Sequence, residues 1–357
     1  MNQNQSSICV VCDENIACID DYLGKHHNIN VIKLAGRQIN QNTLDKYRPD
    51  ALFIRSVSQI NSKIFNRLHQ LKFVGSATIG TDHVDKDFLQ KNNITFGNAK
   101  GCSKHSVAQY VITAILTLYP DYLSKKITLG IIGLGNIGST LAHYAQDLNW
   151  QILGYDPFLE KSELNNSDFK DLLNHSDVVS IHTPLTKNTA YPTYQLFNKS
   201  TLTHLKNHAL LINSARGEII CQNDLIESIF DKKIKTVLDV FPFEPNIDNN
   251  LLNLLTIATP HIAGYTLEGK IRGTDIIYQK FCQTFNLPIK QTIESLLPNN
   301  PYHWQILKND LSLLPNYYDI YHDDKKLRNI NSQYNFGKQF DLLRKDYPLK
   351  REWLFNE

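Results

Sequence analysis

The sequence predicts an α/β protein with two doubly wound, parallel-sheet domains followed by a small α+β domain at the C-terminus. Short apolar stretches alternate with amphipathic segments from about residue 7 to residue 98, and a second alternation starts near residue 127 with a glycine-rich turn. Beyond residue 287 the composition changes, and Pro, Asn and Tyr become frequent. Alternating strands and helices are typical of parallel sheets covered by helices, and 357 residues are enough for two or three domains.

The first domain is expected over residues 1–102. Its predicted strands lie in the segments SICVVCDEN, VIKLAG, DALFIRS, LKFVGSAT and NITFGN. A long periodic segment from residue 103 predicts a helix that leads into the second domain, which we expect over 103–264. Residues 265–288 form a helix returning to the first domain, and 289–357 form the C-terminal domain.

Composition and charge exclude several classes of protein. With 37 basic and 35 acidic residues the net charge is +2, which argues against nucleic acid as a partner. The N-terminus has no signal-peptide pattern, and the longest apolar stretches reach about half of the ~20 residues that a membrane-spanning helix requires. Cys9 and Cys12 form a CxxC pattern within an apolar strand, and no second motif completes a metal site. We therefore expect a cytoplasmic protein with free thiols, no membrane partner and no metal.

The glycine-rich turn carries the pattern Gly133-x-Gly135-x-x-Gly138 between a predicted strand and a predicted helix. In a dinucleotide-binding turn the first glycine permits the tight turn, the second admits the pyrophosphate, and the third lets the helix pack on the strand. The amides of Asn136 and Ile137 would then point at the phosphates from the helix N-terminus. The pattern predicts a Rossmann unit.

Two aspartates follow strands of this domain. Asp156 lies 18 residues after Gly138, where a carboxylate accepts hydrogen bonds from the adenosine ribose and repels a 2′-phosphate, so NAD is favoured over NADP. The plainer interpretation is that GLGNIG is only a glycine-rich turn and that Asp156 is only a helix-start residue. Asp239, in VLDVF, either holds the nicotinamide amide or caps the following turn.

Three segments, NSARGE, DVFPFEP and TPHIAGY, each follow an apolar strand and therefore lie at the carboxyl edge of the sheet. They supply Arg216, Glu244 and His261. Arg216 can bind a carboxylate and polarise a developing carbonyl, His261 can take a hydroxyl proton, and Glu244 can orient the imidazole. Taken singly, each residue is better explained without chemistry, Arg216 by a surface ion pair, Glu244 by a solvated loop acid and His261 by a loop cap.

The order GxGxxG, Asp156, HTPL, NSARGE, LDVF-x-x-EP and TPHIAG resembles that of the D-isomer-specific 2-hydroxyacid dehydrogenases. The resemblance implies a flavodoxin-like substrate-binding domain, a Rossmann NAD-binding domain and a C-terminal dimerisation domain in a homodimer. It also implies further contacts, with the cofactor from Thr183 and Gly264, and with the substrate from Ser56, Thr78 and Tyr265. From the residues alone, Thr183, Ser56 and Thr78 are equally well interpreted as loop caps.

Narrower motifs, IRSVSQIN, FVGSATIGTDHVD, GYTLEGK and FDLLRKDYPLKREW, resemble one branch of this family. They imply NAD-dependent oxidation of the C2 hydroxyl of 4-phospho-D-erythronate to 2-oxo-3-hydroxy-4-phosphobutanoate, in pyridoxal 5′-phosphate biosynthesis. Two departures from that pattern are the short tail after KREW and Ser214-Ala215, where close relatives often carry Ala-Cys. Neither removes a candidate catalytic group.

A phosphorylated acid requires a cation besides Arg216. Arg55 is the first candidate from its position beside Ser56. The basic terminal residues Arg344, Lys345 and Arg351 are further candidates, although a solvated or dimer-interface helix is the simpler interpretation of this cluster. Two alternatives to this function remain open, another D-2-hydroxyacid dehydrogenase of the phosphoglycerate or glycerate type and an NAD(H)-sensing binding protein.

Overall fold

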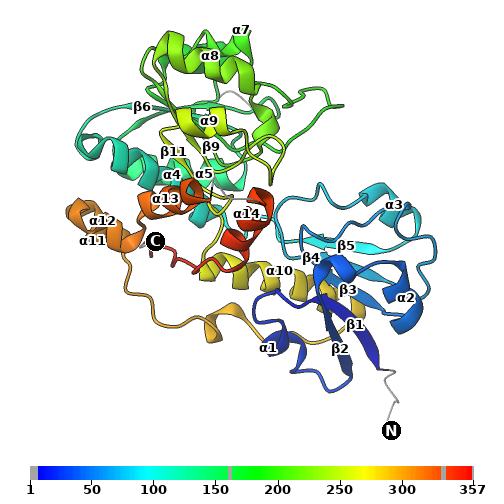
Figure 1. Ribbon diagram of the computed structural model, residues 1–357. Coiled ribbons are helices and arrows are strands. Elements are labelled where there is room, and N and C mark those ends of the chain that lie inside the picture. Colours follow the sequence, from blue (N-terminus) through cyan, green and yellow to red (C-terminus); the bar gives the residue numbers. More distant parts are fainter. Residues whose placement is uncertain (1–6, 160–162, 331–334, 356–357) are drawn as a thin grey trace. The chain divides into compact units, whose positions relative to one another are not determined.

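The computed structural model describes residues 7–159, 163–330 and 335–355. Contacts divide the chain into two units, each made of two separate segments (Figure 1). Unit 1 contains the described residues up to Ser103 together with Leu267–Asn299, and unit 2 contains Lys104–Thr266 together with the residues from Asn300 onward. Each unit is described by itself below.

Unit 1 contains a five-stranded parallel sheet in the order β2-β1-β3-β4-β5. The strands are β1 Ile8–Asp13, β2 Ile29–Leu34, β3 Ala51–Ile54, β4 Phe73–Ser76 and β5 Thr95–Asn98. This order is that of the flavodoxin-like doubly wound fold, and every strand overlaps a segment where the sequence predicted one, although β2 begins two residues before VIKLAG.

The helices of unit 1 are α1 Ile19–Leu23, α2 Gln41–Tyr47, α3 Lys86–Lys91 and α10 Leu267–Phe285. Helix α10 comes from far along the chain and covers one face of the sheet. The ring of Phe281 packs edge-on against those of Phe53 and Phe73, with centroids 5.3 and 5.8 Å apart. All three rings are fully buried, so α10 supplies part of the core that the first hundred residues lack.

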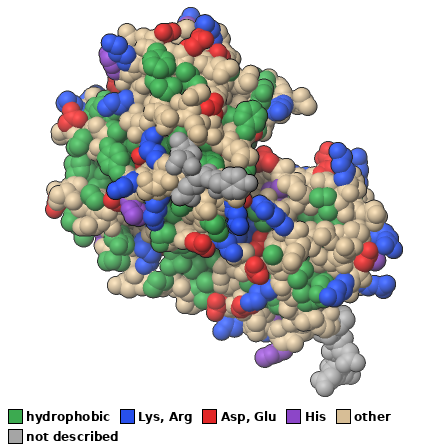
Figure 2. Space-filling view, viewed as in Figure 1, with side chains coloured by type: hydrophobic (Ala, Val, Ile, Leu, Met, Phe, Trp, Pro, Cys, Tyr) green, Lys and Arg blue, Asp and Glu red, His purple; other side chains and the backbone are tan. Residues whose placement is uncertain are grey.

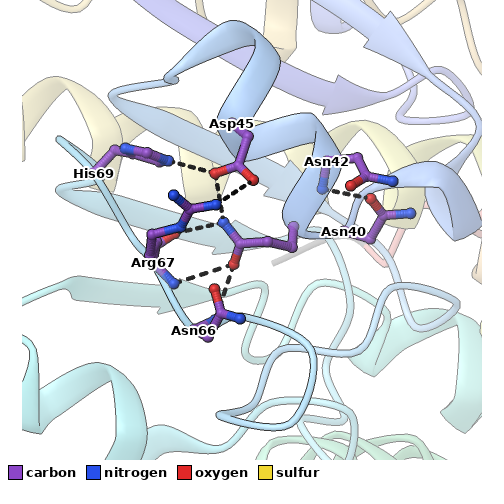
Figure 3. A network of polar contacts seen from close by, with 7 residues as sticks. Asn40, Asn42, Asp45, Asn66, Arg67 and His69 are labelled. Atoms are coloured by element: carbon purple, nitrogen blue, oxygen red, sulfur yellow. Dashed lines mark hydrogen bonds and ion pairs between the residues drawn. The ribbon is translucent and has the colours of Figure 1, made fainter.

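A polar network on unit 1 fastens the segment before β4 to helix α2 (Figure 3). The Asp45 carboxylate accepts hydrogen bonds from His69 at 2.7 Å, from Gln41 at 2.9 Å and from Arg67 at 3.1 Å. The hydrogen bond from His69 is the main reason why the pKa of Asp45 is lowered. Because the network lies at the surface and the Arg67 side chain is exposed, it orients the segment more than it stabilises the fold.

Unit 2 contains a six-stranded parallel sheet in the order β11-β10-β9-β8-β6-β7. The strands are β6 Thr128–Ile132, β7 Gln151–Tyr155, β8 Val178–Ile181, β9 Leu210–Asn213, β10 Lys235–Leu238 and β11 Ile257–Ala258. The chain runs from β6 to β7 on one side and returns to β8 on the other side of β6. In open α/β sheets this reversal of strand order is where ligands bind, at the carboxyl ends of the strands.

The described helices of unit 2 are α4 Lys104–Leu118, α5 Asn136–Asp147, α6 Phe169–His175, α7 Lys199–Leu202, α8 Gln222–Lys232, α9 Asn249–Leu254, α11 Trp304–Asn309, α12 Leu314–Tyr317, α13 Ile320–Asn329 and α14 Phe336–Lys345. Helix α4 is buried on almost every side from Ser106 to Leu116, which explains its nearly continuous apolar sequence. The two predicted parallel-sheet domains are confirmed.

The sequence led us to expect a separate α+β domain from residue 289. In the structure the described residues from Asn300 onward belong to unit 2, where α13 lies against β11 and α4 (Figure 1). The indoles of Trp304 and Trp353 stack with centroids 5.5 Å apart, and Tyr144 of α5 meets Trp304 edge-on. In this described part of the chain the β character is limited to isolated bridges, such as His303 with Leu354. Its predicted role in dimerisation stays a prediction.

Basic and acidic side chains are interspersed over the face shown in Figure 2, as the small net charge suggests. All six cysteines are free, with Cys12 buried and Cys9 half-buried in β1. Among the described residues the structure has no cluster of metal-ligating side chains, and no described helix is long and apolar enough to span a membrane.

Candidate active site

The first and third glycines of the Gly133-x-Gly135-x-x-Gly138 turn are required by the packing of unit 2. Gly133 has φ +91°, and a Cβ there would lie 2.9 Å from both the His182 carbonyl oxygen and Thr183 Cγ2. A Cβ on Gly138 would lie 2.0 Å from the Gly133 carbonyl oxygen. The turn therefore brings the ends of β6 and β8 together and lets α5 approach the strand closely.

Gly135 is different, because a Cβ there would meet no protein atom within 4 Å. Its φ of −68° is one that any residue adopts. It is the N-cap of the twelve-residue helix α5, and no side chain caps that helix. The packing of the protein itself does not demand a glycine here, whereas a phosphate approaching the first amides of α5 would.

Asp156, just after β7, holds its carboxylate beside the glycine turn. Oδ2 accepts a hydrogen bond from the Leu134 amide at 3.1 Å, and Oδ1 accepts one from the Phe158 amide at 3.1 Å. The Asn166 side chain bonds the Asp156 backbone on both sides, at 2.8 Å each. The carboxylate thus lies beside the glycine turn and also closes the turn at residues 157–158, and its predicted contact with a ribose stays a prediction.

Two hydroxyls near the ends of β8 and β9 have no hydrogen-bond partner among the described residues. Thr183 Oγ1 and Ser214 Oγ are both buried, as is Nδ1 of His182, which precedes Thr183 in sequence. Burial lowers the pKa of His182 to about 3, so the imidazole is neutral. Buried polar atoms are nearly always paired, and orphaned ones at a strand end fit a polar ligand. Together with the space above Gly135, they fit a dinucleotide on this edge of the sheet.

The strands β9, β10 and β11 are neighbours and lead to Arg216, Glu244 and His261 in turn. A Cβ on Gly217 would lie 2.0 Å from the Phe241 carbonyl carbon, so the loops after β9 and β10 are in backbone contact. The three predicted catalytic segments therefore lie at one edge of unit 2.

Arg216 is half-buried in a loop that Asn213 braces. The Asn213 amide donates to the Arg216 carbonyl oxygen at 2.8 Å and accepts from the Ala215 amide at 3.0 Å. Nη1 of Arg216 donates to the Ala215 carbonyl oxygen at 2.7 Å, which holds the guanidinium against its own loop.

His261 and Glu244 form a close pair, with His261 Nδ1 2.8 Å from Glu244 Oε2. The Phe241 amide fixes the other carboxylate oxygen at 2.8 Å. Burial alone would raise the pKa of Glu244, but the attraction and hydrogen bond of His261, with help from Arg344, outweigh it and the pKa is lowered. The ionised carboxylate can only accept, so Nδ1 carries a proton and Nε2 is the nitrogen available for chemistry.

The backbone at His261 supports a functional role. Its φ of +57° lies in the left-handed region that side chains other than glycine seldom adopt. Its side chain is 32% exposed, which is enough for a substrate to reach the ring.

Asp239 holds the loop that carries His261. Its buried carboxylate accepts hydrogen bonds from Thr259 Oγ1 at 2.6 Å, from the Ile262 amide at 2.8 Å and from the Ala263 amide at 2.9 Å. Burial raises the pKa of Asp239, although the nearby His261 and these hydrogen bonds oppose the shift. The acid thus clamps the TPHIAG loop, residues 259–264, and its predicted contact with the nicotinamide stays a prediction.

The remaining predicted residues fall in both units. In unit 1, Ser56 is exposed, whereas the Thr78 hydroxyl donates to the Gly80 carbonyl oxygen at 3.0 Å, which is the capping alternative. In unit 2, Gly264 and Tyr265 are half-buried at the end of the TPHIAG loop. Their contacts with cofactor and substrate stay predictions.

Two cations lie near this loop, Arg344, which the sequence offered as one candidate for the substrate phosphate, and Lys350, which the sequence did not single out. Lys350 Nζ lies 3.7 Å from the centroid of the Tyr318 ring and 3.4 Å from the Ile262 carbonyl oxygen. Burial lowers the pKa of Lys350 to about 8. Arg344 of α14 reaches the Tyr265 hydroxyl at 3.4 Å. No local pattern marks either residue, since both lie in a basic segment that is typical of a solvated helix.

Comparison with known proteins agrees with this geometry. Residues 118–263 match the model of the D-isomer specific 2-hydroxyacid dehydrogenase, NAD binding domain. A protein of Psychrobacter arcticus named erythronate-4-phosphate dehydrogenase is 50% identical, with 97% of this chain and 99% of that protein covered. A protein of the same name from Acinetobacter baumannii is 44% identical, covering 96% and 97%. The chain belongs to the erythronate-4-phosphate dehydrogenase family.

This membership confirms the resemblance predicted from the motifs, and with it the class of enzyme. The chain is an NAD-dependent dehydrogenase. Among solved structures it is similar to NAD⁺-bound 3-phosphoglycerate dehydrogenase of Entamoeba histolytica, with a TM-score of 0.66 and 23% identity over 81% of this chain and 99% of that one. At that identity the likeness concerns the fold.

Proposed function

We propose that this enzyme oxidises the C2 hydroxyl of 4-phospho-D-erythronate to 2-oxo-3-hydroxy-4-phosphobutanoate while NAD is reduced, in the biosynthesis of pyridoxal 5′-phosphate. The substrate is that of relatives up to 50% identical over almost the whole chain. The single observation on this chain that carries the chemistry is the 2.8 Å contact between His261 Nδ1 and Glu244 Oε2 at the end of neighbouring strands. It supplies an oriented base where a hydroxyl must be deprotonated.

Each group then has one task. NAD, when bound, would supply the acceptor for the hydride that leaves C2. His261 Nε2 takes the hydroxyl proton, and the ionised Glu244 stabilises the imidazolium that results. The guanidinium of Arg216 binds the C1 carboxylate as a fixed fork and polarises the developing carbonyl oxygen.

The cofactor contacts follow the observed strand ends. Gly135 and the first amides of α5 take the pyrophosphate, and Asp156 takes the adenosine ribose. Thr183, whose buried hydroxyl has no partner among the described residues, completes the contacts next to Gly133. Substrate contacts from Ser56, Thr78 and Tyr265 are part of the same proposal.

A turnover assay with 4-phosphoerythronate and NAD, followed by NADH absorbance, tests the proposal. The wild type should form NADH, and His261→Ala should lose turnover while its dissociation constant for NAD stays within about twofold. A collapse of NAD affinity in that variant would mean that the histidine holds structure instead.

The same assay separates the alternatives. Turnover of phosphoglycerate or glycerate without turnover of 4-phosphoerythronate would favour another D-2-hydroxyacid dehydrogenase. Binding of NADH without turnover of any hydroxy acid would favour a sensing protein.

The proposal extends to assembly and location. The family resemblance implies a homodimer to which the C-terminal segment contributes, and light scattering of the purified protein measures that state. Six free cysteines fit the reducing cytoplasm, where thiols persist.

A further inference from the structure

Helix α14 (Phe336–Lys345) brings one of its basic residues to the predicted active site. In its last turn, Arg344 Nη2 donates to the Tyr265 hydroxyl at 3.4 Å. Tyr265 lies four residues beyond His261 in sequence. Burial on its own would lower the pKa of Arg344, but the neighbouring Tyr265 and Glu244 raise it. Arg344 therefore stays a cation next to the residues that carry the chemistry.

The guanidinium of Arg344 has more donors than partners. Its Nε is buried without a hydrogen-bond partner, and the 3.4 Å contact with Tyr265 is long for a hydrogen bond. Its remaining contact is with the Phe340 ring, 5.9 Å from the guanidinium carbon to the ring centroid. Within the described part of the chain Arg344 forms no ion pair. An arginine carries five N–H donors, and a buried donor left unpaired costs about 1–3 kcal/mol.

The next residue of the helix, Lys345, is exposed, as is usual for a lysine on a surface helix, whereas Arg344 is half-buried. The amphipathic pattern of α14 therefore does not explain why a charged group with spare donors is turned toward Tyr265 and Glu244. An anionic ligand at the site would pair it.

We propose that Arg344 binds the phosphate group of the substrate; this inference rests on the function proposed above. Arg216 and His261 account for the carboxylate at C1 and the hydroxyl at C2, and no other group assigned so far in unit 2 pairs the charge at C4. A guanidinium matches phosphate oxygens with two parallel N–H donors, and a dianion would pair the buried Nε. The Tyr265 hydroxyl, already bonded to Arg344, lies beside the same anion.

Arg344→Gln, with Lys345→Gln as the matched control, tests this assignment. The values of kcat/KM are measured by NADH formation with 4-phosphoerythronate and with unphosphorylated erythronate. In Arg344→Gln we expect kcat/KM for the phosphorylated acid to fall at least about 100-fold, mainly through KM, while that for erythronate changes by less than about threefold. Arg344→Lys should retain an intermediate value because it keeps the charge but not the fork. Lys345→Gln should match the wild type.

A second measurement does not depend on turnover. Inorganic phosphate should raise the unfolding temperature of the NAD-loaded wild type and of Lys345→Gln, and should have no such effect on Arg344→Gln. Equal losses on both acids, or an equal response of Arg344→Gln to phosphate, would overturn the assignment. A different outcome is a wild type that fails to oxidise 4-phosphoerythronate while phosphate still raises its unfolding temperature and that of Arg344→Gln stays unchanged. That result would contradict the proposed function and still support an anion site at Arg344.

Discussion

The imidazole of His261 is held by Glu244, Nδ1 to Oε2, at 2.8 Å, and the carboxylate is held in turn by the Phe241 amide. The ring therefore has one orientation and one tautomer, set by a group that follows a different strand.

Glu244→Gln keeps the size of the side chain but removes the charge that stabilises the imidazolium. We expect kcat to fall by about 10²- to 10⁴-fold, with the affinity for NAD unchanged. Glu227→Gln is the control, because Glu227 is an exposed acid of α8 paired with Lys199 on the surface. If both variants kept wild-type kcat, the contact of Glu244 with His261 would be structural only.

Gly135→Ala and Gly138→Ala should separate cofactor binding from folding. The added methyl at Gly135 meets no protein atom, so stability should change by no more than about 1 kcal/mol while NAD binds at least about tenfold more weakly. At Gly138 the methyl would lie 2.0 Å from a carbonyl oxygen, and we expect destabilisation of at least about 1–3 kcal/mol. Thermal unfolding and titration with NAD measure both effects. Equal NAD affinity in wild type and Gly135→Ala would show that no phosphate approaches this glycine.

Asp156→Ser should relax the preference for NAD over NADP. Removing the carboxylate removes the repulsion of a 2′-phosphate and the bonds to the ribose, so the ratio of kcat/KM for NADP to that for NAD should rise at least about tenfold. Steady-state kinetics with the two cofactors gives this ratio directly. If kcat/KM fell equally with NAD and with NADP, the only role of Asp156 would be to hold the turn through its bond with the Leu134 amide.

Lys350 should make stability depend on pH above neutrality. Burial lowers its pKa to about 8 from the ordinary 10.5, so between these values the unfolded chain binds a proton that the folded chain does not. The free energy of unfolding contributed by this group therefore rises with pH across that window. Between about pH 7.5 and about pH 9.5, the unfolding temperature of the wild type should increase relative to that of Lys350→Met. If the difference in unfolding temperature between the wild type and Lys350→Met did not change with pH, the Lys350 ammonium would be better solvated than its burial indicates.

Much of this architecture was accessible from the sequence because the determining patterns are local. Each strand of both sheets is a short apolar run ended by turn residues, and the three glycines mark the first turn of unit 2 directly. The pairing of Glu244 with His261 was also predictable, since parallel strands end at the same edge of a sheet.

What was missed depends on contacts between distant segments. Arg344 and Lys350 lie in a basic stretch whose composition is typical of a solvated helix, and only the packing of that stretch on unit 2 encloses them. The same packing explains why residues from Asn300 onward form part of unit 2, whereas their composition indicated a separate domain. The bonds from Asp239 to the TPHIAG loop join residues more than 20 positions apart in two of three cases, so no short motif records them.

The interleaving of the two units has a consequence for biosynthesis of the chain. The sheet of unit 1 obtains Phe281 only when α10 has left the ribosome, and Trp304 obtains its stacking partner only after residue 353 has been made. A growing polypeptide therefore exposes unfinished apolar surface of both units until these late segments emerge, and chaperones would be needed most during that interval. A chain that stopped before residue 353 would leave Trp304 without its stacking partner.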